Sequence, residues 1–240
     1  MPDVNNSGIH TNAMESETIM KATIDLTPTL DFLDELRVHN HKAWFDQNRP
    51  AYEVARETFE RFIDAIIDEF RAADQLRELT AKDCIFRMNR DVRFSKDKSP
   101  YKTNFGALIG PGGRKSMQEG YYLSIEPRGL SLIAGGWYMP EGPQLAKFRK
   151  AIDRDASAFK KIMRAKAFVE HFGTLEGEKL KTAPQGYAKD HPEIELLRLK
   201  QITVMHHLTD EAVLAPHFTK HTVAVCRAMR PFLNYLDGLK

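Results

Sequence analysis

Apolar residues recur in steps of three and four along much of the chain, the spacing that places side chains on one face of a helix. The longest such stripe runs from Tyr52 to Phe70, and the charged residues on its opposite side, including Arg56, are predicted to face solvent. Thr27 and Pro28 favour a helix start, with Thr27 as its cap. Helices are predicted over six segments: residues 27–37, 39–49, 50–73, 144–152, 156–171 and 209–236.

Between these helices the pattern changes to a period of two, which is typical of strands. Strands are predicted over five segments: residues 84–94, 105–109, 121–126, 130–138 and 200–208. Their short links indicate antiparallel hairpins. The predicted fold class is α+β, with an antiparallel sheet of about five strands packed with N-terminal, middle and C-terminal helices. Residues 25–240 are expected to form a single domain, and residues 1–24 a disordered N-terminal tail, because they show no periodic pattern.

The first predicted strand carries the most unusual pattern in the chain. If its backbone is extended, apolar side chains form one row, broken by Arg90, and polar side chains form the other. The apolar row holds Phe86, Met88, Val92 and Phe94, and the polar row holds Arg87, Asn89, Asp91 and Arg93. A turn stiffened by Pro100 follows over residues 95–101.

We expect this stretch to bind an anion, because arginine presents a planar fork of donors that fits carboxylate and phosphate groups. Residues 82–102 contain seven Lys and Arg residues against three Asp residues. The predicted ligand-binding residues are Arg87, Asn89, Arg93, Lys98, Ser99, Tyr101, Lys102, Tyr122 and Trp137. An ion-pair network that fixes the turn to the sheet would explain many of the same residues.

Two other kinds of function are compatible with these residues. A hydrolytic or phosphoryl-handling enzyme would use Asp91 or Glu126 as general base and the loop residue His191 as acid. A protein-interaction module would present Trp137 and Tyr138 on an exposed patch. The residues do not decide whether the protein is an enzyme.

Composition and charge narrow the expected partners. A hydrophobic content of 42% and a charged content of 28% are typical of a soluble globular protein. The net charge of +2 creates no overall field that would attract nucleic acid or a membrane, so nucleic acid is a weaker expectation than a small anionic ligand. No apolar run reaches the roughly 18–20 residues that span a bilayer, and no secretory signal is evident. A cytoplasmic location is therefore expected, and the oligomeric state is not predicted.

Signals for a metal or a cofactor are weak. His217 and His221 lie four residues apart, but no third ligand with fitting spacing accompanies them. The glycine-rich segment at residues 110–116 lacks the spacing of a phosphate-binding loop. We therefore expect no metal and no cofactor. Cys84 and Cys226 lie among apolar residues and are predicted to be buried, reduced thiols.

The segment from Arg87 to Asn104 is similar to the signature of the family known as domain of unknown function 2461. Three further segments carry the resemblance, residues 121–127, 135–141 and 186–192, and the similarity covers about residues 28–239. It implies a single-domain, soluble, mainly bacterial protein with no assigned reaction, and it transfers no catalytic residues. The leading prediction is thus a basic, aromatic-lined pocket for a phosphate-like ligand.

Overall fold

The computed structural model describes residues 23–240 except residues 73, 75, 77, 117 and 176. The predicted disordered tail falls almost entirely outside the described residues. The helices are α1 (Thr27–Val38), α2 (Lys42–Gln47), α3 (Arg49–Phe70), α4 (Ala81–Cys84), the 3-10 helix η1 (Gly113–Lys115), α5 (Gly142–Arg154), α6 (Ser157–Met163), α7 (Lys166–Phe172), α8 (Ile194–Leu197), α9 (Asp210–Leu214) and α10 (Phe218–Asp237). The strands are β1 (Phe105–Ile109), β2 (Tyr121–Ile125), β3 (Ser131–Trp137) and β4 (Ile202–Leu208).

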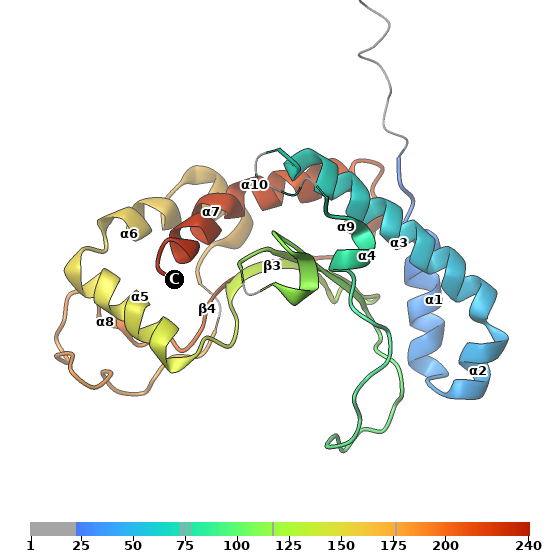
Figure 1. The fold of residues 1–240 in the computed structure, drawn as a ribbon, viewed down its shortest axis with the longest axis horizontal. Coiled ribbons are helices and arrows are strands. Elements are labelled where there is room, and N and C mark those ends of the chain that lie inside the picture. The colour runs from blue at the N-terminus through green and yellow to red at the C-terminus, as the bar shows by residue number, and fades with distance from the viewer. Residues whose placement is uncertain (1–22, 73, 75, 77, 117, 176) are drawn as a thin grey trace, which may run out of the picture.

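The strands form one antiparallel sheet in the order β1-β2-β3-β4. Helices α3 and α10 arch over one face of this sheet, and α1 packs against α3 (Figure 1). The segment between β3 and β4 forms a separate lobe of helices, α5 to α8, at one side of the sheet (Figure 1). The α+β class and the antiparallel pairing are therefore confirmed. Within the described residues, no helix is both long and apolar enough to cross a bilayer.

Helix α3 follows directly from its sequence pattern. Pro50 lies in its first turn, where a missing backbone N–H costs nothing. The predicted apolar stripe is buried, and Phe59 stacks on Phe105 of β1 with ring centroids 5.5 Å apart. Burial of such large side chains contributes about 1.5–3 kcal/mol each. This stripe therefore fixes α3 on the sheet and determines which side of the helix faces outward.

Gly135 of β3 allows the close approach of α10. A Cβ atom at this position would lie 2.3 Å from Sδ of Met229 and 3.0 Å from Cδ2 of Leu233. A side chain at this position would therefore have to displace the Met229 and Leu233 side chains of α10. Both cysteines are buried and free, as predicted, and burial raises the pKa of the Cys84 thiol to about 12.

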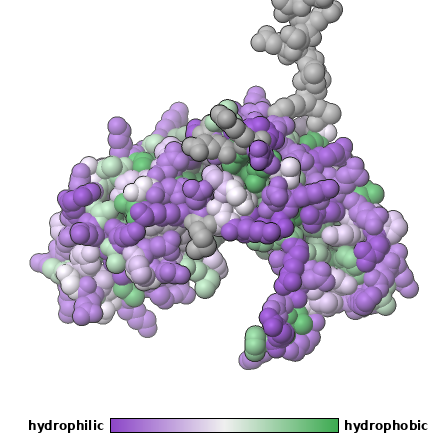
Figure 2. All heavy atoms as spheres, viewed as in Figure 1, coloured by the Kyte–Doolittle hydropathy of each residue, from purple (hydrophilic) through white to green (hydrophobic). Residues whose placement is uncertain are grey.

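The predicted strand over residues 84–94 is wrong, and the sheet has four strands rather than about five. Residues 85–104, which we call the arm, form an irregular hairpin. A single bridge between Ile85 and Ala107 joins the arm to the edge strand β1, and a second bridge, between Asn89 and Tyr101, links the two sides of the arm. The two sides of the arm share backbone hydrogen bonds such as that from Lys102 N to Met88 O, 2.9 Å. The arm leaves the sheet and extends from the body of the protein (Figures 1 and 2).

The arm also corrects the predicted apolar row. Met88 is buried at 4% exposure, but Phe94, which was expected to face the core, is 96% exposed near the tip. Alternation predicted a core-facing row broken only by Arg90, whereas the hairpin carries the outer half of that row beyond the core. A second difference is that residues 156–171 form two helices, α6 and α7, because Ala165 adopts an extended backbone conformation with ψ at 134°.

Candidate functional site

The arm places the predicted ligand-binding residues at more than one site. Arg87, Asn89 and Tyr101 line one cavity at the base of the arm. Ser99 and Lys102 line a second cavity, to which Tyr101 also contributes. The polar row is therefore divided, and only its first half borders a cavity together with other cationic side chains.

The remaining predicted residues lie elsewhere. Tyr122 lines a third cavity, on the sheet face opposite α3 and α10. Trp137 is 4% exposed and belongs to the core. Arg93 and Lys98 are exposed on the arm and line none of these three cavities. A single pocket formed by all nine residues is not what the structure shows.

The cavity that contains Arg87 and Asn89, which we call the basal cavity, has a volume of about 680 Å³. Six of its lining side chains are cationic and none is a carboxylate. Its lining residues are Phe45, Arg49, Tyr52, Arg56, Lys82, Ile85, Phe86, Arg87, Met88, Asn89, Tyr101, Arg114 and Lys115. The cavity thus combines a strong local excess of positive charge with an aromatic wall.

Helix α3 supplies one side of the basal cavity through its first two turns. Arg49, Tyr52 and Arg56 are spaced three and four residues apart, so they share a helix face. Arg56 Nε lies 2.8 Å from Glu60 Oε1, and Arg49 Nη2 lies 3.5 Å from Asp46 Oδ1. These two arginines are therefore partly neutralised by carboxylates outside the cavity lining.

The opposite side comes from η1 and α4. Gly112 and Gly113 have positive φ angles of 83° and 60°, and a Cβ atom on Gly113 would lie 2.6 Å from the Asp83 carbonyl oxygen. These glycines let the turn pack closely against α4. As a result, Arg114 donates a hydrogen bond to the Lys82 carbonyl oxygen. The next residue, Lys115, also lines the cavity.

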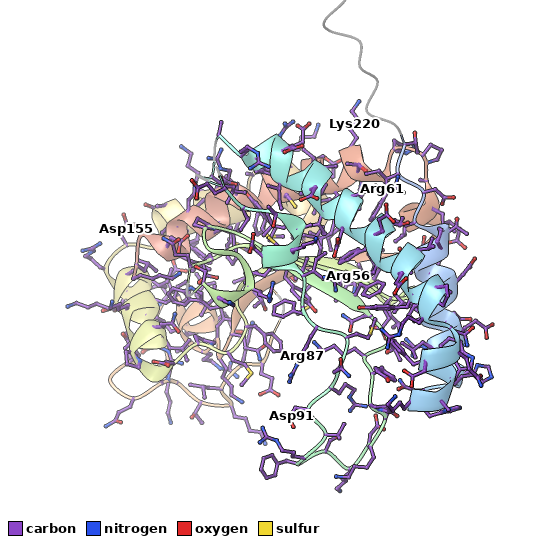
Figure 3. The ribbon with its side chains drawn as sticks, turned by 45° about the vertical axis from the view of Figure 1, so that its right-hand side comes forward. Arg56, Arg61, Arg87, Asp91, Asp155 and Lys220 are labelled. Atoms are coloured by element: carbon purple, nitrogen blue, oxygen red, sulfur yellow. The ribbon has the colours of Figure 1, made fainter. Side chains whose placement is uncertain are left out.

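Three cations of the basal cavity lack a close partner among the described residues. The side chains of Lys82, Arg87 and Lys115 form no hydrogen bond or ion pair with another residue in this part of the chain. Arg87 is exposed at the base of the arm, with Asp91 farther toward the tip (Figure 3). Like charges gathered without close ion pairs repel one another, and a bound anion would relieve that repulsion.

The base of the arm is held firmly against α1 and α2. Tyr101 stacks on Phe45 with ring centroids 4.1 Å apart at an interplanar angle of 18°. Asn40 donates from Nδ2 to the Tyr101 carbonyl oxygen at 3.0 Å and accepts from the Tyr101 backbone N at 3.1 Å. The side chain of Asn40 thus pairs with Tyr101 as a strand backbone would, which fixes the wall of the cavity in advance of any ligand.

A comparison with known protein families matches most of the chain. A family model described as "Conserved hypothetical protein (DUF2461)" matches residues 28–235. The chain belongs to this family. No curated protein and no solved structure matches it.

In this DUF2461 chain, the second cavity, which we call the lateral cavity, has a volume of about 470 Å³ and a different charge arrangement. Arg37 Nη2 lies 2.5 Å from Glu126 Oε1, to which the Thr103 hydroxyl also donates at 2.8 Å. Arg90 forms an ion pair with Asp97. Two of the cations lining the lateral cavity are therefore already neutralised, as the predicted structural network would require.

Polar contacts also perturb the titration of groups around the lateral cavity. Hydrogen bonds from the Ser99 hydroxyl and backbone N, followed by the contact with Arg90, hold the pKa of Asp97 below its usual range. Burial, together with the nearby Arg87 charge, lowers the pKa of Lys102. Lys102 Nζ lies 5.5 Å from the centroid of the Phe86 ring.

The acid and base residues considered for catalysis lie apart. His191 Nε2 is 3.1 Å from Asp153 Oδ1 of α5, and its Nδ1 accepts from the Glu193 backbone N at 3.0 Å. Asp91 pairs with Arg93 on the arm, and the Arg93 side chain lowers the pKa of that carboxyl. Glu126 forms an ion pair with Arg37. The DUF2461 structure therefore brings no two of Asp91, Glu126 and His191 together.

Only one of the two aromatic residues predicted to form an exposed interaction patch is exposed. Trp137 is buried, whereas Tyr138 is 60% exposed. A single exposed tyrosine does not make an apolar patch. The residues that sequence reasoning missed are the basal cations outside the arm: Arg49, Arg56, Lys82, Arg114 and Lys115.

Proposed function

We propose that this protein binds a small phosphate-bearing ligand in the basal cavity. The observation that carries the proposal is the lining itself, in which six cationic side chains and no carboxylate surround about 680 Å³. Arginine and lysine donors bind phosphate oxygens through charge-assisted hydrogen bonds. The ligand should contact Lys82, Arg87 and Lys115 first, because no carboxylate of the described chain forms an ion pair with them.

The aromatic residues act as walls rather than as stacking surfaces for a base. The Tyr101 and Phe45 rings stack on each other, and the Lys102 ammonium group lies over the Phe86 ring. Affinity would therefore come mainly from charge and hydrogen bonding. Among the described residues, no carboxylate or histidine lines the cavity, so we place binding ahead of a reaction that needs a general acid or base.

The test is calorimetric titration of the untagged protein with phosphate and with pyrophosphate at low ionic strength. Arg87→Ala removes a cation of the cavity, and Arg93→Ala is its matched control because Arg93 lies on the same arm outside the cavity. We expect Arg87→Ala to weaken binding by about tenfold or more, since a hydrogen bond to a charged group contributes about 1.5–3 kcal/mol. Arg93→Ala should leave the affinity unchanged.

A second comparison distinguishes a small ligand from a nucleic-acid end. If the proposal holds, a 5′-phosphorylated dinucleotide should compete no better than pyrophosphate. Absence of saturable binding by both anions, or equal losses in the two variants, would refute the assignment.

A further inference from the structure

Three histidines from distant parts of the chain meet beside the sheet, away from the basal cavity. His171 lies in the last turn of α7, His206 lies on β4, and His221 lies on α10. The ring centroids of His206 and His221 are 5.1 Å apart, and that of His171 is 5.4 Å from His206. All three side chains are half-buried. Sequence reasoning considered His221 with His217 and did not connect it to His206.

The hydrogen bonds of His206 determine which ring nitrogen has a lone pair. Its Nδ1 lies 2.8 Å from the His171 carbonyl oxygen, and a carbonyl oxygen can only accept. In the uncharged ring Nδ1 therefore carries the proton, and the lone pair is on Nε2. His221 Nε2–H therefore donates to that lone pair at 3.0 Å, and a metal ion bound to both Nε2 atoms would replace this proton.

Burial is the main cause that lowers the pKa of His221, and the neighbouring His206, His171 and His217 rings lower it further. Burial and then His206 also lower the pKa of His171.

We propose that His206 and His221 form a two-histidine site for a divalent transition-metal ion with tetragonal geometry, Cu²⁺ or Ni²⁺. The two Nε2 atoms are 3.0 Å apart. With metal–nitrogen bonds of about 2.0–2.1 Å, this separation gives an angle of roughly 90–100° at the metal. Such an angle fits the adjacent positions of square-planar or tetragonal Cu²⁺ and Ni²⁺ better than a tetrahedral ion.

The second contact of His206 supports this geometry. Ligating histidines commonly donate their other ring N–H to a backbone carbonyl or carboxylate, which orients the ring. The His171 carbonyl oxygen accepts such a bond here. In the described part of the chain, no three His, Cys, Asp or Glu side chains are grouped to hold a metal. The other coordination positions would accordingly go to water or to a small exogenous ligand.

The experiment is electron paramagnetic resonance of the full chain, with any affinity tag removed, during titration with Cu²⁺. We expect a tight first equivalent whose hyperfine pattern reports two imidazole nitrogens. His206→Gln and His221→Gln should each abolish that equivalent. His207→Gln is the matched control, because His207 is adjacent on β4 and points to the opposite sheet face; it should retain the equivalent.

Two outcomes would overturn the proposal: a first equivalent that persists in both the His206 and the His221 variants, or its loss in the His207 control. Circular dichroism of each variant checks the fold. Should His206→Gln fail to fold, His221→Gln together with ¹⁵N spectra of the wild-type imidazoles decides the matter. The His206 signals should then broaden upon addition of one equivalent of paramagnetic Cu²⁺, and their persistence would exclude His206 as a ligand.

Discussion

The basal and lateral cavities share the arm and the Tyr101 side chain, yet they differ in how many of their cations form ion pairs. In the lateral cavity, Arg37 and Arg90 are matched by Glu126 and Asp97. In the basal cavity, four of the six cations form no ion pair with a carboxylate within the described residues, and one of these four, Arg114, bonds to a backbone carbonyl oxygen instead. The comparison teaches that a high count of Lys and Arg does not identify a binding site. The absence of nearby counter-charges is the more informative property.

The largest expected effect comes from the residue that both cavities share. Tyr101→Ala should reduce the free energy of unfolding by about 3–5 kcal/mol, as for other buried aromatic residues truncated to alanine. It should also weaken phosphate binding, because the wall against Phe45 is lost. Urea denaturation measures the first effect. Tyr138→Ala, at an exposed tyrosine, should change stability by less than about 0.5 kcal/mol, and similar losses in both variants would contradict the assigned roles.

The next prediction distinguishes the two cavities, because a substitution in the lateral cavity should lower the stability of the protein and leave ligand binding unchanged. Arg37→Ala leaves Glu126 without its cation, and both side chains are about three-quarters buried, at 26% and 21% exposure. We expect a loss of about 1–2 kcal/mol in the free energy of unfolding with no change in phosphate affinity. Thermal unfolding with parallel calorimetric titration checks both halves. A fall in affinity without loss of stability would reverse the roles of the two cavities.

A smaller effect should appear when a carboxylate is added to the basal cavity. Asn89→Asp places a negative charge near Arg87, and we expect phosphate binding to weaken about fivefold, equivalent to about 1 kcal/mol. Stability should not fall, because the new charge faces unpaired cations. The control Gln185→Glu adds the same charge on an exposed loop and should leave binding unchanged. Equal weakening in both would indicate a general charge effect.

The smallest effect concerns pH. The folded-state pKa of Asp97 is depressed, first by the hydrogen bonds from Ser99. Its stabilising contribution should be complete above the ordinary carboxyl pKa of about 4 and should be lost as the pH falls further. Melting temperatures measured between neutral and acidic pH should therefore decline less steeply for Asp97→Asn than for the wild type. Parallel curves would show that these hydrogen bonds do not persist in solution.

Much of the fold could be predicted because single segments carry it. The stripe of α3 and the alternation of β1 to β4 are local patterns, and the structure confirms them. Alternation in the arm was misleading for a physical reason. A hairpin that leaves the sheet can keep a period of two, so the sequence around Phe94 resembles a half-buried strand even though no core lies beneath it.

The candidate site could be predicted only in part. Arg87, Asn89 and Tyr101 were found because they are close in sequence. Arg56 was assigned to solvent, since nothing local shows that the arm passes beside that face of α3. One usable signal was present: Arg49, Tyr52 and Arg56 share a helical face directly after the short helix that carries Phe45.

The exposed tip of the arm has a practical consequence. The tip of the arm lies beyond the backbone hydrogen bond that Arg90 N donates to Pro100 O. Phe94, in this tip, is exposed and makes no contribution to the core. A fluorophore attached through a cysteine introduced at position 94 would lie near the exposed tip of the arm, away from the folded body. Its emission anisotropy would give a direct readout of any large molecule that docks from that direction, without disturbing the architecture underneath.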